Sequence, residues 1–178
     1  QDVNVNYNHD FVVSADRGIY KRGNEPADEN QFVGAITLSK SSESERCKVT
    51  NRNGDLISAA RIDIDVFSKE IQFTNVNGVI SGMQQGKAEG RRIEFSANTL
   101  SWNNAKELLV LQDNVTVHEE GFGHLFSNGE VRIFQQAVGN KKQLKRLETD
   151  GDTVIVFHDP EKSLDHTLIS HGSLVVDH

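Results

Sequence analysis

The 178-residue chain has little of several features that would place it in a familiar class. Cys47 is its single cysteine, so an intrachain disulfide is excluded. No stretch approaches the roughly 20 consecutive apolar residues that a membrane-spanning helix needs, so we expect the chain as given to be soluble. Its two prolines, Pro26 and Pro160, leave most of the chain free to form long, unbroken strands.

Clustered basic residues are scarce. The net charge is −7 at pH 7, and neutralising nucleic-acid phosphates needs grouped lysines and arginines. One short basic cluster, Lys141, Lys142, Lys145 and Arg146, is interpreted as a solvated face. We therefore expect no nucleic-acid partner.

Sequence signatures of common enzymes are missing. The chain has no Gly-x-Ser-x-Gly, no phosphate-binding loop and no dinucleotide fingerprint. Carboxylates are available, but no pattern separates a catalytic acid from a solvent-facing strand residue at Asp63, Asp65, Glu119, Glu120 or Asp159. We predict no enzymatic activity, no catalytic residues and no cofactor.

Seven histidines raise the question of a metal site. His118 and His124 flank a glycine turn and could converge, whereas His166 and His171 are five residues apart and would diverge on an unbroken strand. Because metal sites usually need three or four ligands, we interpret the histidines as solvated side chains and predict no metal.

β-Branched residues are in excess. Valine and isoleucine number 29 together, against 21 leucines and alanines, and β-branched side chains favour strands. Apolar and polar residues alternate in Val3–Tyr7 and Ala60–Val66, as expected for strands with one buried face. Further strands are predicted at Val33–Leu38, Ile71–Thr74, Ile93–Ala97, Leu108–Leu111, Asn114–His118, Glu130–Phe134, Thr153–Phe157 and Ser173–Val176.

Turn residues separate these strands at intervals of about ten residues, which favours one all-β domain over residues 1–178: an antiparallel sandwich, barrel or jelly roll. One helix is expected at Gln135–Leu147, because Leu144 and Leu147 are three residues apart. Gly23–Asn30 and Ser39–Glu45 are polar and are expected to be loops. The predicted turns are Asn53-Gly54-Asp55, Asn77-Gly78, Ala88-Glu89-Gly90, Gly121-Phe122-Gly123 and Asn128-Gly129.

An internal repeat relates residues 56–80 to residues 93–117. Each segment is interpreted as a two-strand unit that cannot cover its own apolar face, so neighbouring units must stack into long, twisted sheets. Residues 135–178 match this pattern least. At offsets of 38, 37 and 36 residues, Ser58-Ala59 aligns with Ser96-Ala97, Lys69-Glu70 with Lys106-Glu107, and Asn77-Gly78-Val79 with Asp113-Asn114-Val115.

Trp102 and the run Leu108–Leu111 are the most informative apolar features. Four consecutive apolar residues on a strand place two side chains on each face. Either this strand is central and packed on both sides, or one face lines a groove for an apolar ligand, with Trp102 at its polar edge.

The repeat also resembles a known family. Its best stretch, Phe95–Val117, reads FSANTLSWNNAKELLVLQDNVTV, and related residues continue at Gly123–Leu125 and Val131–Ile133. The order of Ser-Ala, an alternating strand, Lys-Glu, an apolar strand and an Asn-Val closing turn is similar to the repeat unit of the OstA-like (LptA/LptC) family of bacterial lipopolysaccharide-transport proteins. The similarity covers residues 32–134.

This resemblance implies a twisted antiparallel β-jelly roll, open at both ends, whose inner faces carry acyl chains. It implies a periplasmic protein that binds lipopolysaccharide and passes it on without catalysing a reaction. Such a protein is either a bridge between inner- and outer-membrane components or a member anchored to the inner membrane by a preceding segment. The predicted lipid-lining residues are Ile62, Ile64, Ile71, Phe73, Leu100, Trp102, Leu109, Leu111, Val115, Val117, Val131 and Ile133.

Other jelly-roll components of the transport bridge are the expected partners. Unpaired strand edges would make these contacts, and because head-to-tail pairing does not close, a head-to-tail homo-oligomer is a natural outcome. An extracytoplasmic carbohydrate-binding or structural β-sandwich is the alternative, although one tryptophan and two tyrosines are poor provision for stacking on sugars. The predicted edge positions are Val3, Val5, Tyr7, Leu174 and Val176.

Overall fold

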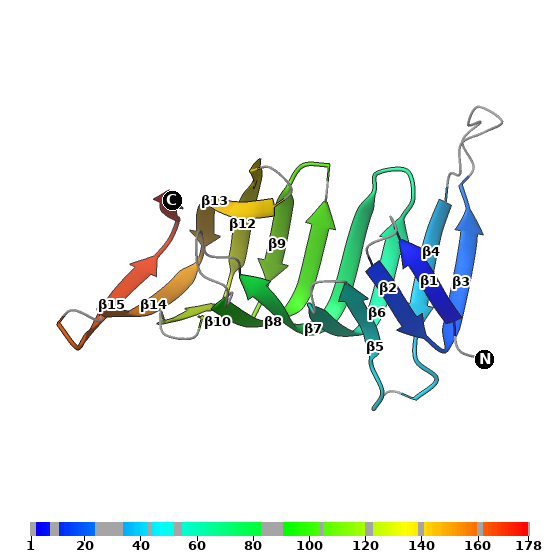
Figure 1. Ribbon diagram of the computed structural model, residues 1–178, viewed down its shortest axis with the longest axis horizontal. Helices are drawn as coiled ribbons and strands as arrows, with labels where there is room; N and C mark the ends of the chain where they lie inside the picture. Colours follow the sequence, from blue (N-terminus) through cyan, green and yellow to red (C-terminus); the bar gives the residue numbers. More distant parts are fainter. Residues whose placement is uncertain are drawn as a thin grey trace.

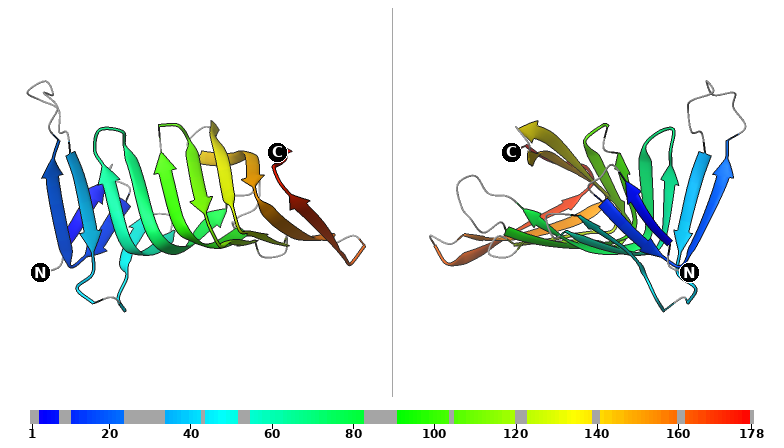
Figure 2. Two further views of the ribbon diagram at one scale, coloured as in Figure 1. Left: turned by 180° about the vertical axis from the view of Figure 1, so that it is seen from behind. Right: turned by 45° about the vertical axis from the view of Figure 1, so that its right-hand side comes forward.

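The described part of the protein is one open antiparallel β-sheet. The computed structural model describes residues 3–7, 11–23, 34–42, 44–51, 55–82, 91–103, 105–119, 123–138, 141–159 and 162–177. Sixteen strands form the sheet, and none of these residues lies in a helix. The sheet is folded along a line that crosses its strands, so that its two sides face each other, as Figure 2 shows. The all-β prediction is therefore confirmed.

The fold line divides the sheet into two layers (Figure 1). Three long strands cross it and belong to both layers: β6 (Leu56–Asp65), β7 (Glu70–Gly82) and β8 (Arg91–Asn103). The front layer adds β1 (Val3–Tyr7), β2 (Phe11–Ala15), β5 (Cys47–Asn51), β10 (Val115–Glu119), β11 (Gly123–Ser127), β14 (Asp152–Asp159) and β15 (Leu164–His171). The back layer adds β3 (Arg17–Arg22), β4 (Gly34–Ser39), β9 (Leu108–Gln112), β12 (Glu130–Val138), β13 (Lys141–Asp150) and β16 (Leu174–Asp177).

Most residues of the fold line are polar, and several of them have unusual backbone angles. The pairing of β6 with β7 and of β7 with β8 skips Ala60, Asn75 and Asn98, so the long strands bend there. Asp113 and Asn114 form the equivalent bend between β9 and β10. Asn75, Asp113 and Asn114 have φ angles of 50°, 58° and 52°, a left-handed conformation that asparagine and aspartate tolerate better than most residues.

Backbone hydrogen bonds connect neighbouring bends. The Asn98 N–H donates to the Asp113 carbonyl at 2.9 Å, and the Asp113 N–H donates to the Gly129 carbonyl at 3.1 Å. The Asn128 N–H likewise donates to the Asp152 carbonyl at 3.1 Å. The fold line is therefore a hydrogen-bonded part of the sheet rather than a gap in it.

A single core lies between the two layers. Next to the fold line, mostly small side chains of the front layer meet larger ones of the back layer, so the space between converging layers is filled. The small, buried front residues are Ala15, Cys47, Ala59, Val76, Ala97 and Val115, and the buried back residues are Leu38, Ile62, Phe73, Leu100, Leu111 and Val131.

Cys47, the single cysteine of the chain, belongs to this core. It lies on β5 and pairs with Ala59, and its side chain is fully buried. Burial raises the pKa of the thiol, because the thiolate would lose its hydration. Cys47 therefore acts as a small apolar side chain.

The structure corrects the prediction of a turn at Asn77-Gly78. Both residues lie inside β7, and Gly78 pairs with Phe95 on β8. A Cβ added at Gly78 would lie 2.5 Å from the tip of the Phe95 ring. The absence of a side chain at Gly78 therefore leaves the space that the Phe95 ring occupies.

The helix expected at Gln135–Leu147 is also wrong. This segment contributes to β12 and β13, which pair as a hairpin with Val138 opposite Lys141. Phe134 pairs with Arg146 and Gln135 with Leu144, so Lys145 is the extra residue of a β-bulge. The bulge accounts for the three-residue leucine spacing that imitated a helix.

The repeat is real in the structure, but its offset stays at 38 residues up to the second bend. Asp65 Oδ1 accepts hydrogen bonds from the N–H groups of Phe67 and Ser68 in the β6–β7 turn, and Asn103 Oδ1 accepts one from Lys106 in the β8–β9 turn. Both turns end on a residue with positive φ, Lys69 and Glu107. The alignments at offsets of 37 and 36 were therefore shifted.

The predicted strands are confirmed with changed bounds, and the described part of the Ser39–Glu45 loop connects β4 to β5. Asn128-Gly129 is a bend between β11 and β12 rather than a hairpin turn. No complete strand was predicted at β2, β3, β5, β11, β13 or β15. All or part of four other predictions lies outside the described residues: Gly23–Asn30, Asn53-Gly54-Asp55, Ala88-Glu89-Gly90 and Gly121-Phe122-Gly123.

Candidate ligand-binding face

The candidate site is the inner face, meaning the sides of the two layers that face each other. All twelve predicted lipid-lining residues belong to the apolar cluster on this face. Eight are buried: Ile62, Ile64, Ile71, Phe73, Leu100, Leu111, Val115 and Val131. Four are half-buried against them: Trp102, Leu109, Val117 and Ile133.

Strand register places these residues in continuous rows. In the back layer, Ile64 pairs with Ile71, Ile71 with Trp102, and Trp102 with Leu109. The same row continues through Ile133, Leu147 and Val176 to the last strand. An apolar strip therefore runs across the back layer from β6 to β16.

The N-terminal part of the inner face is closed. A small apolar cavity of about 10 Å³ lies there between the layers, with Phe73 and Trp102 in its lining. Since a cavity needs about 10–15 Å³ of such space to hold even one water molecule, this one does not accommodate an acyl chain. The other lining residues are Val13, Val49, Ile62, Ile64 and Ile71.

Toward the C-terminal end the apolar rows become accessible. In the front layer Leu125 is buried, its neighbour Ile155 is half-buried, and Leu168 on β15 is 39% exposed. Phe157 is 37% exposed and stacks on His166 with ring centroids 5.1 Å apart. This end offers apolar surface that a ligand can reach.

Polar groups also enter the inner face near the C-terminal part of the fold line. Thr153 is fully buried, and its hydroxyl donates to Ser127 Oγ at 3.0 Å. Thr149 lies on the other side of the bend at Gly151, is 2% exposed, and its buried Oγ1 has no hydrogen-bond partner among the described residues. The fold line is thus less apolar here than between Ala15 and Val115.

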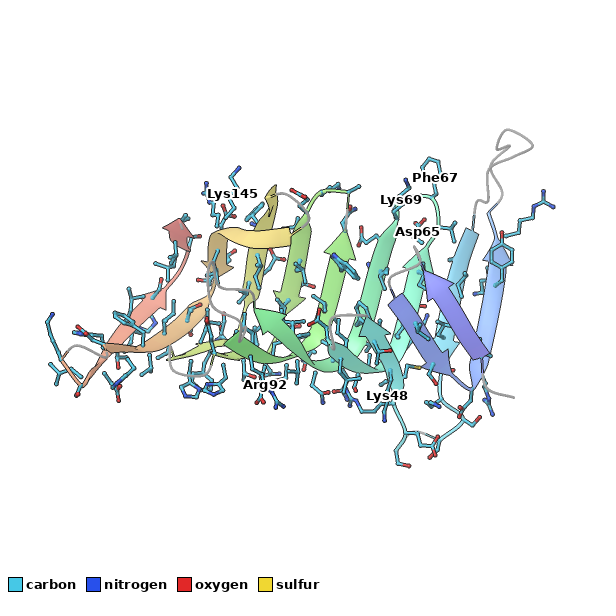
Figure 3. The ribbon with its side chains drawn as sticks, viewed as in Figure 1. Lys48, Asp65, Phe67, Lys69, Arg92 and Lys145 are labelled. Atoms are coloured by element: carbon cyan, nitrogen blue, oxygen red, sulfur yellow. The ribbon has the colours of Figure 1, made fainter. Side chains whose placement is uncertain are left out.

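The outer faces carry charged and polar side chains. On the back layer, Arg132 lies between Glu130 and Glu148 and pairs with both carboxylates. On the front layer, Lys48 and Arg92 point away from the inner face (Figure 3). A hollow of about 250 Å³ on this outer side is lined by apolar and polar groups, Leu56, Ser58, Asn77, Gly78, Val79, Glu94 and Phe95.

The five histidines that the structure describes lie on β10, β11, β14 and β15, toward the C-terminal end. His118 and His124 pair across β10 and β11 with stacked rings 4.2 Å apart, so their expected convergence is confirmed. His171 Nδ1 lies 2.9 Å from Asp152 Oδ1, and this contact lowers the pKa of the Asp152 carboxyl. Within the described ranges, no three His, Cys, Asp or Glu side chains group closely enough to hold a metal ion.

Part of the inner face was missed in the sequence. Leu147 was assigned to a helix, and Leu168 lies on a strand that was not predicted. Alternation at His166, Leu168 and Ser170 was the available signal, but only one of these residues is strongly apolar. The accessible end was therefore harder to predict than the closed end.

Comparisons with known proteins do not assign this chain to a family. No protein-family model matches the chain, and no curated protein matches it. Among the residues that the structure describes, no helix is long and apolar enough to cross a membrane.

Proposed function

We propose that this domain is a lipid-binding transport module that holds acyl chains against the C-terminal part of its inner face. The observation that carries the proposal is the change along one apolar row of the front layer, from buried at Leu125 to 39% exposed at Leu168. A closed core alone does not account for the accessible rows. The OstA-like pattern of the repeat supports the further proposal that this sheet is a twisted jelly roll, open at both ends.

Lipopolysaccharide is the ligand that we propose. Its acyl chains match the apolar rows, and each methylene group removed from water contributes about 0.8 kcal/mol. The chain carries a net charge of −7, so an anionic headgroup would be repelled by its outer surface. Binding is therefore expected through the acyl chains, with the headgroup outside.

A periplasmic location and a role between inner- and outer-membrane components complete the proposal. Direction would come from an energy source elsewhere in the system, since no reaction is assigned to this domain. Sheet edges are the proposed partner surfaces. β1 and β15 end the front layer, and β3 and β16 end the back layer, so both predicted edge segments lie at edges.

Photo-crosslinking from two neighbouring positions tests the lipid proposal. Leu168 and Ile169 are both apolar and exposed on β15, but Leu168 faces inward and Ile169, which is 61% exposed, faces outward. A photoreactive residue at 168 should label purified lipopolysaccharide, and one at 169 should label it at least several-fold less. Equal labelling at the two positions, or none at 168, would exclude the inner face as the binding surface.

Labelling from position 109 extends the test into the back layer. Leu109 lies in the inner row between Trp102 and Ile133, and Val110 next to it faces outward. The same preference for the inward residue is expected there. Labelling confined to Val110 would instead favour a ligand on the outer surface, as the carbohydrate-binding alternative requires.

A further inference from the structure

Two histidines lie side by side on the outer face of the front layer. His118 on β10 pairs directly with His124 on β11, and their rings stack with centroids 4.2 Å apart and planes 20° apart. Their strand neighbours Val117 and Leu125 belong to the inner apolar cluster, so by alternation both histidines face outward. On the other side of His118, the register places Glu94 of β8. The three residues therefore form one outer row across three neighbouring strands.

The imidazole nitrogens of this pair are not engaged by neighbouring described residues. His158 Nδ1 and His171 Nδ1 each lie 2.9 Å from an aspartate oxygen. For His118 and His124, by contrast, the contacts found within the described ranges are ring contacts alone. His118 Nδ1 is buried without a hydrogen-bond partner there, which leaves Nε2 as the nitrogen that can reach a ligand at the surface.

Two imidazoles and a carboxylate are ligands that suit a divalent transition-metal ion such as Zn²⁺. Two nitrogens on one tetrahedral zinc ion lie about 3.4 Å apart, because each Zn–N bond is about 2.0–2.1 Å long. The ring centroids are 4.2 Å apart, so tilting the outer edges of the rings together by less than about 1 Å would give this spacing. His124 is exposed, and its ring therefore has room to tilt.

We propose that His118 and His124 bind one divalent transition-metal ion, with Glu94 as a third ligand. In the structure Glu94 Oε1 lies 3.1 Å from Arg92 Nε, and the three side chains of the outer row do not yet group as a metal site. Both side chains of this ion pair are at least half exposed, and Arg92 points away from the inner face (Figure 3). Exposed ion pairs contribute little stability, so Glu94 can exchange Arg92 for the metal at low cost.

The position of this site gives it a structural consequence that does not depend on the lipid proposal. A metal ion bound to the outer row would link β8, β10 and β11, beside the point where the inner face changes from closed to accessible. With two histidines, one carboxylate and no described partner for His118 Nδ1, binding should be weaker than at structural zinc sites with four ligands. For these two histidines, the inference departs from the expectation of solvated side chains.

Isothermal titration calorimetry of the purified chain with zinc chloride tests the proposal. One equivalent of Zn²⁺ should bind, and His118→Ala should weaken binding by at least about tenfold. His124→Phe should do the same while it keeps an aromatic ring in the stack. His158→Ala and His171→Ala are the matched controls and should leave the affinity unchanged, because these side chains contact aspartates instead. Affinity that is unchanged in both outer-row variants, or lost equally in the controls, would overturn the inference.

Arg92 and Glu94 provide a test with opposite signs. Arg92→Ala should tighten zinc binding several-fold, because it removes the partner that competes for the Glu94 carboxylate. Glu94→Gln should weaken binding several-fold, and in the double variant the gain from Arg92→Ala should be lost. Unchanged affinity in Glu94→Gln, or a gain that remains in full in the double variant, would overturn the assignment of Glu94 as a ligand.

Discussion

The two ends of the inner face have the same two-layer arrangement but differ in how accessible their apolar residues are. Between β2 and β8, the rows beside the fold line are buried and apolar, and the remaining cavity is about 10 Å³. Between β11 and β16, threonine and serine lie beside the fold line, and apolar residues farther from it are partly exposed. The difference indicates that the N-terminal end supplies most of the stability, while the C-terminal end supplies accessible surface.

The largest expected effect comes from truncating one residue at each end. Phe73→Ala removes a ring that is 1% exposed and should lower the free energy of unfolding by about 3–5 kcal/mol. Leu168→Ala removes a side chain that is 39% exposed, so only part of its transfer free energy is lost and the cost should be about 1 kcal/mol. Urea denaturation of both variants measures the contrast, and similar losses would contradict the division into two ends.

A glycine comparison should give the next largest effect. Gly78→Ala places a methyl group 2.5 Å from the Phe95 ring and 3.1 Å from the Leu56 carbonyl oxygen, so we expect a loss of about 1–3 kcal/mol. Gly172→Ala is the control at the C-terminal end, because an added Cβ there meets nothing within 4 Å. Thermal unfolding of both should show a lower Tm only for the Gly78 variant.

Two threonines sharpen the comparison within the C-terminal end. Thr149→Val removes a buried hydroxyl that lacks a partner among the described residues and should stabilise the fold by up to about 1 kcal/mol. Thr153→Val removes the hydrogen bond to Ser127 and should destabilise it by about 1 kcal/mol. Opposite signs in urea denaturation are the expected result, and a loss in both variants would mean that Thr149 has a partner.

The smallest expected effect depends on pH at the N-terminal end of the fold line. Asp16 Oδ1 lies 2.7 Å from Lys40 Nζ, and this bond is the main cause of the lowered pKa of the Asp16 carboxyl. A lowered pKa stabilises the fold above the ordinary value near 4, and that contribution is lost as the pH falls through the folded-state pKa. Asp16→Asn should therefore narrow the difference in urea midpoint between pH 6 and pH 3, and an unchanged difference would exclude this role.

Sequence patterns predicted the closed end well. Alternation in Ala60–Val66 identified β6, and the inner residues there are strongly apolar, so the buried face could be read directly. The fold line could not be predicted in the same way. Asparagine and glycine occur both at hairpin turns and at bends within strands. Only the pairing of β6 with β7 shows that Asn75 lies at a bend and that the strand continues beyond it.

The C-terminal end was predicted less completely, for a physical reason. Its inner face mixes apolar residues with Thr153, His166 and Ser170, which weakens the period-two signal. The bulge at Lys145 also shifts the alternation by one residue, and a shifted alternation imitates a helix over a short window. Exposure and irregularity thus reduce the sequence signal at the same end where the proposed ligand binds.

The 38-residue offset has a consequence for how such a chain could change in length. Equivalent points such as Lys69 and Glu107 are separated by two bent strands, one in each direction. Duplicating a whole repeat would lengthen the sheet and leave the direction of its last strand unchanged. Inserting a single bent strand would reverse that direction, so growth in steps of two strands is the route that preserves the directions of both edge strands.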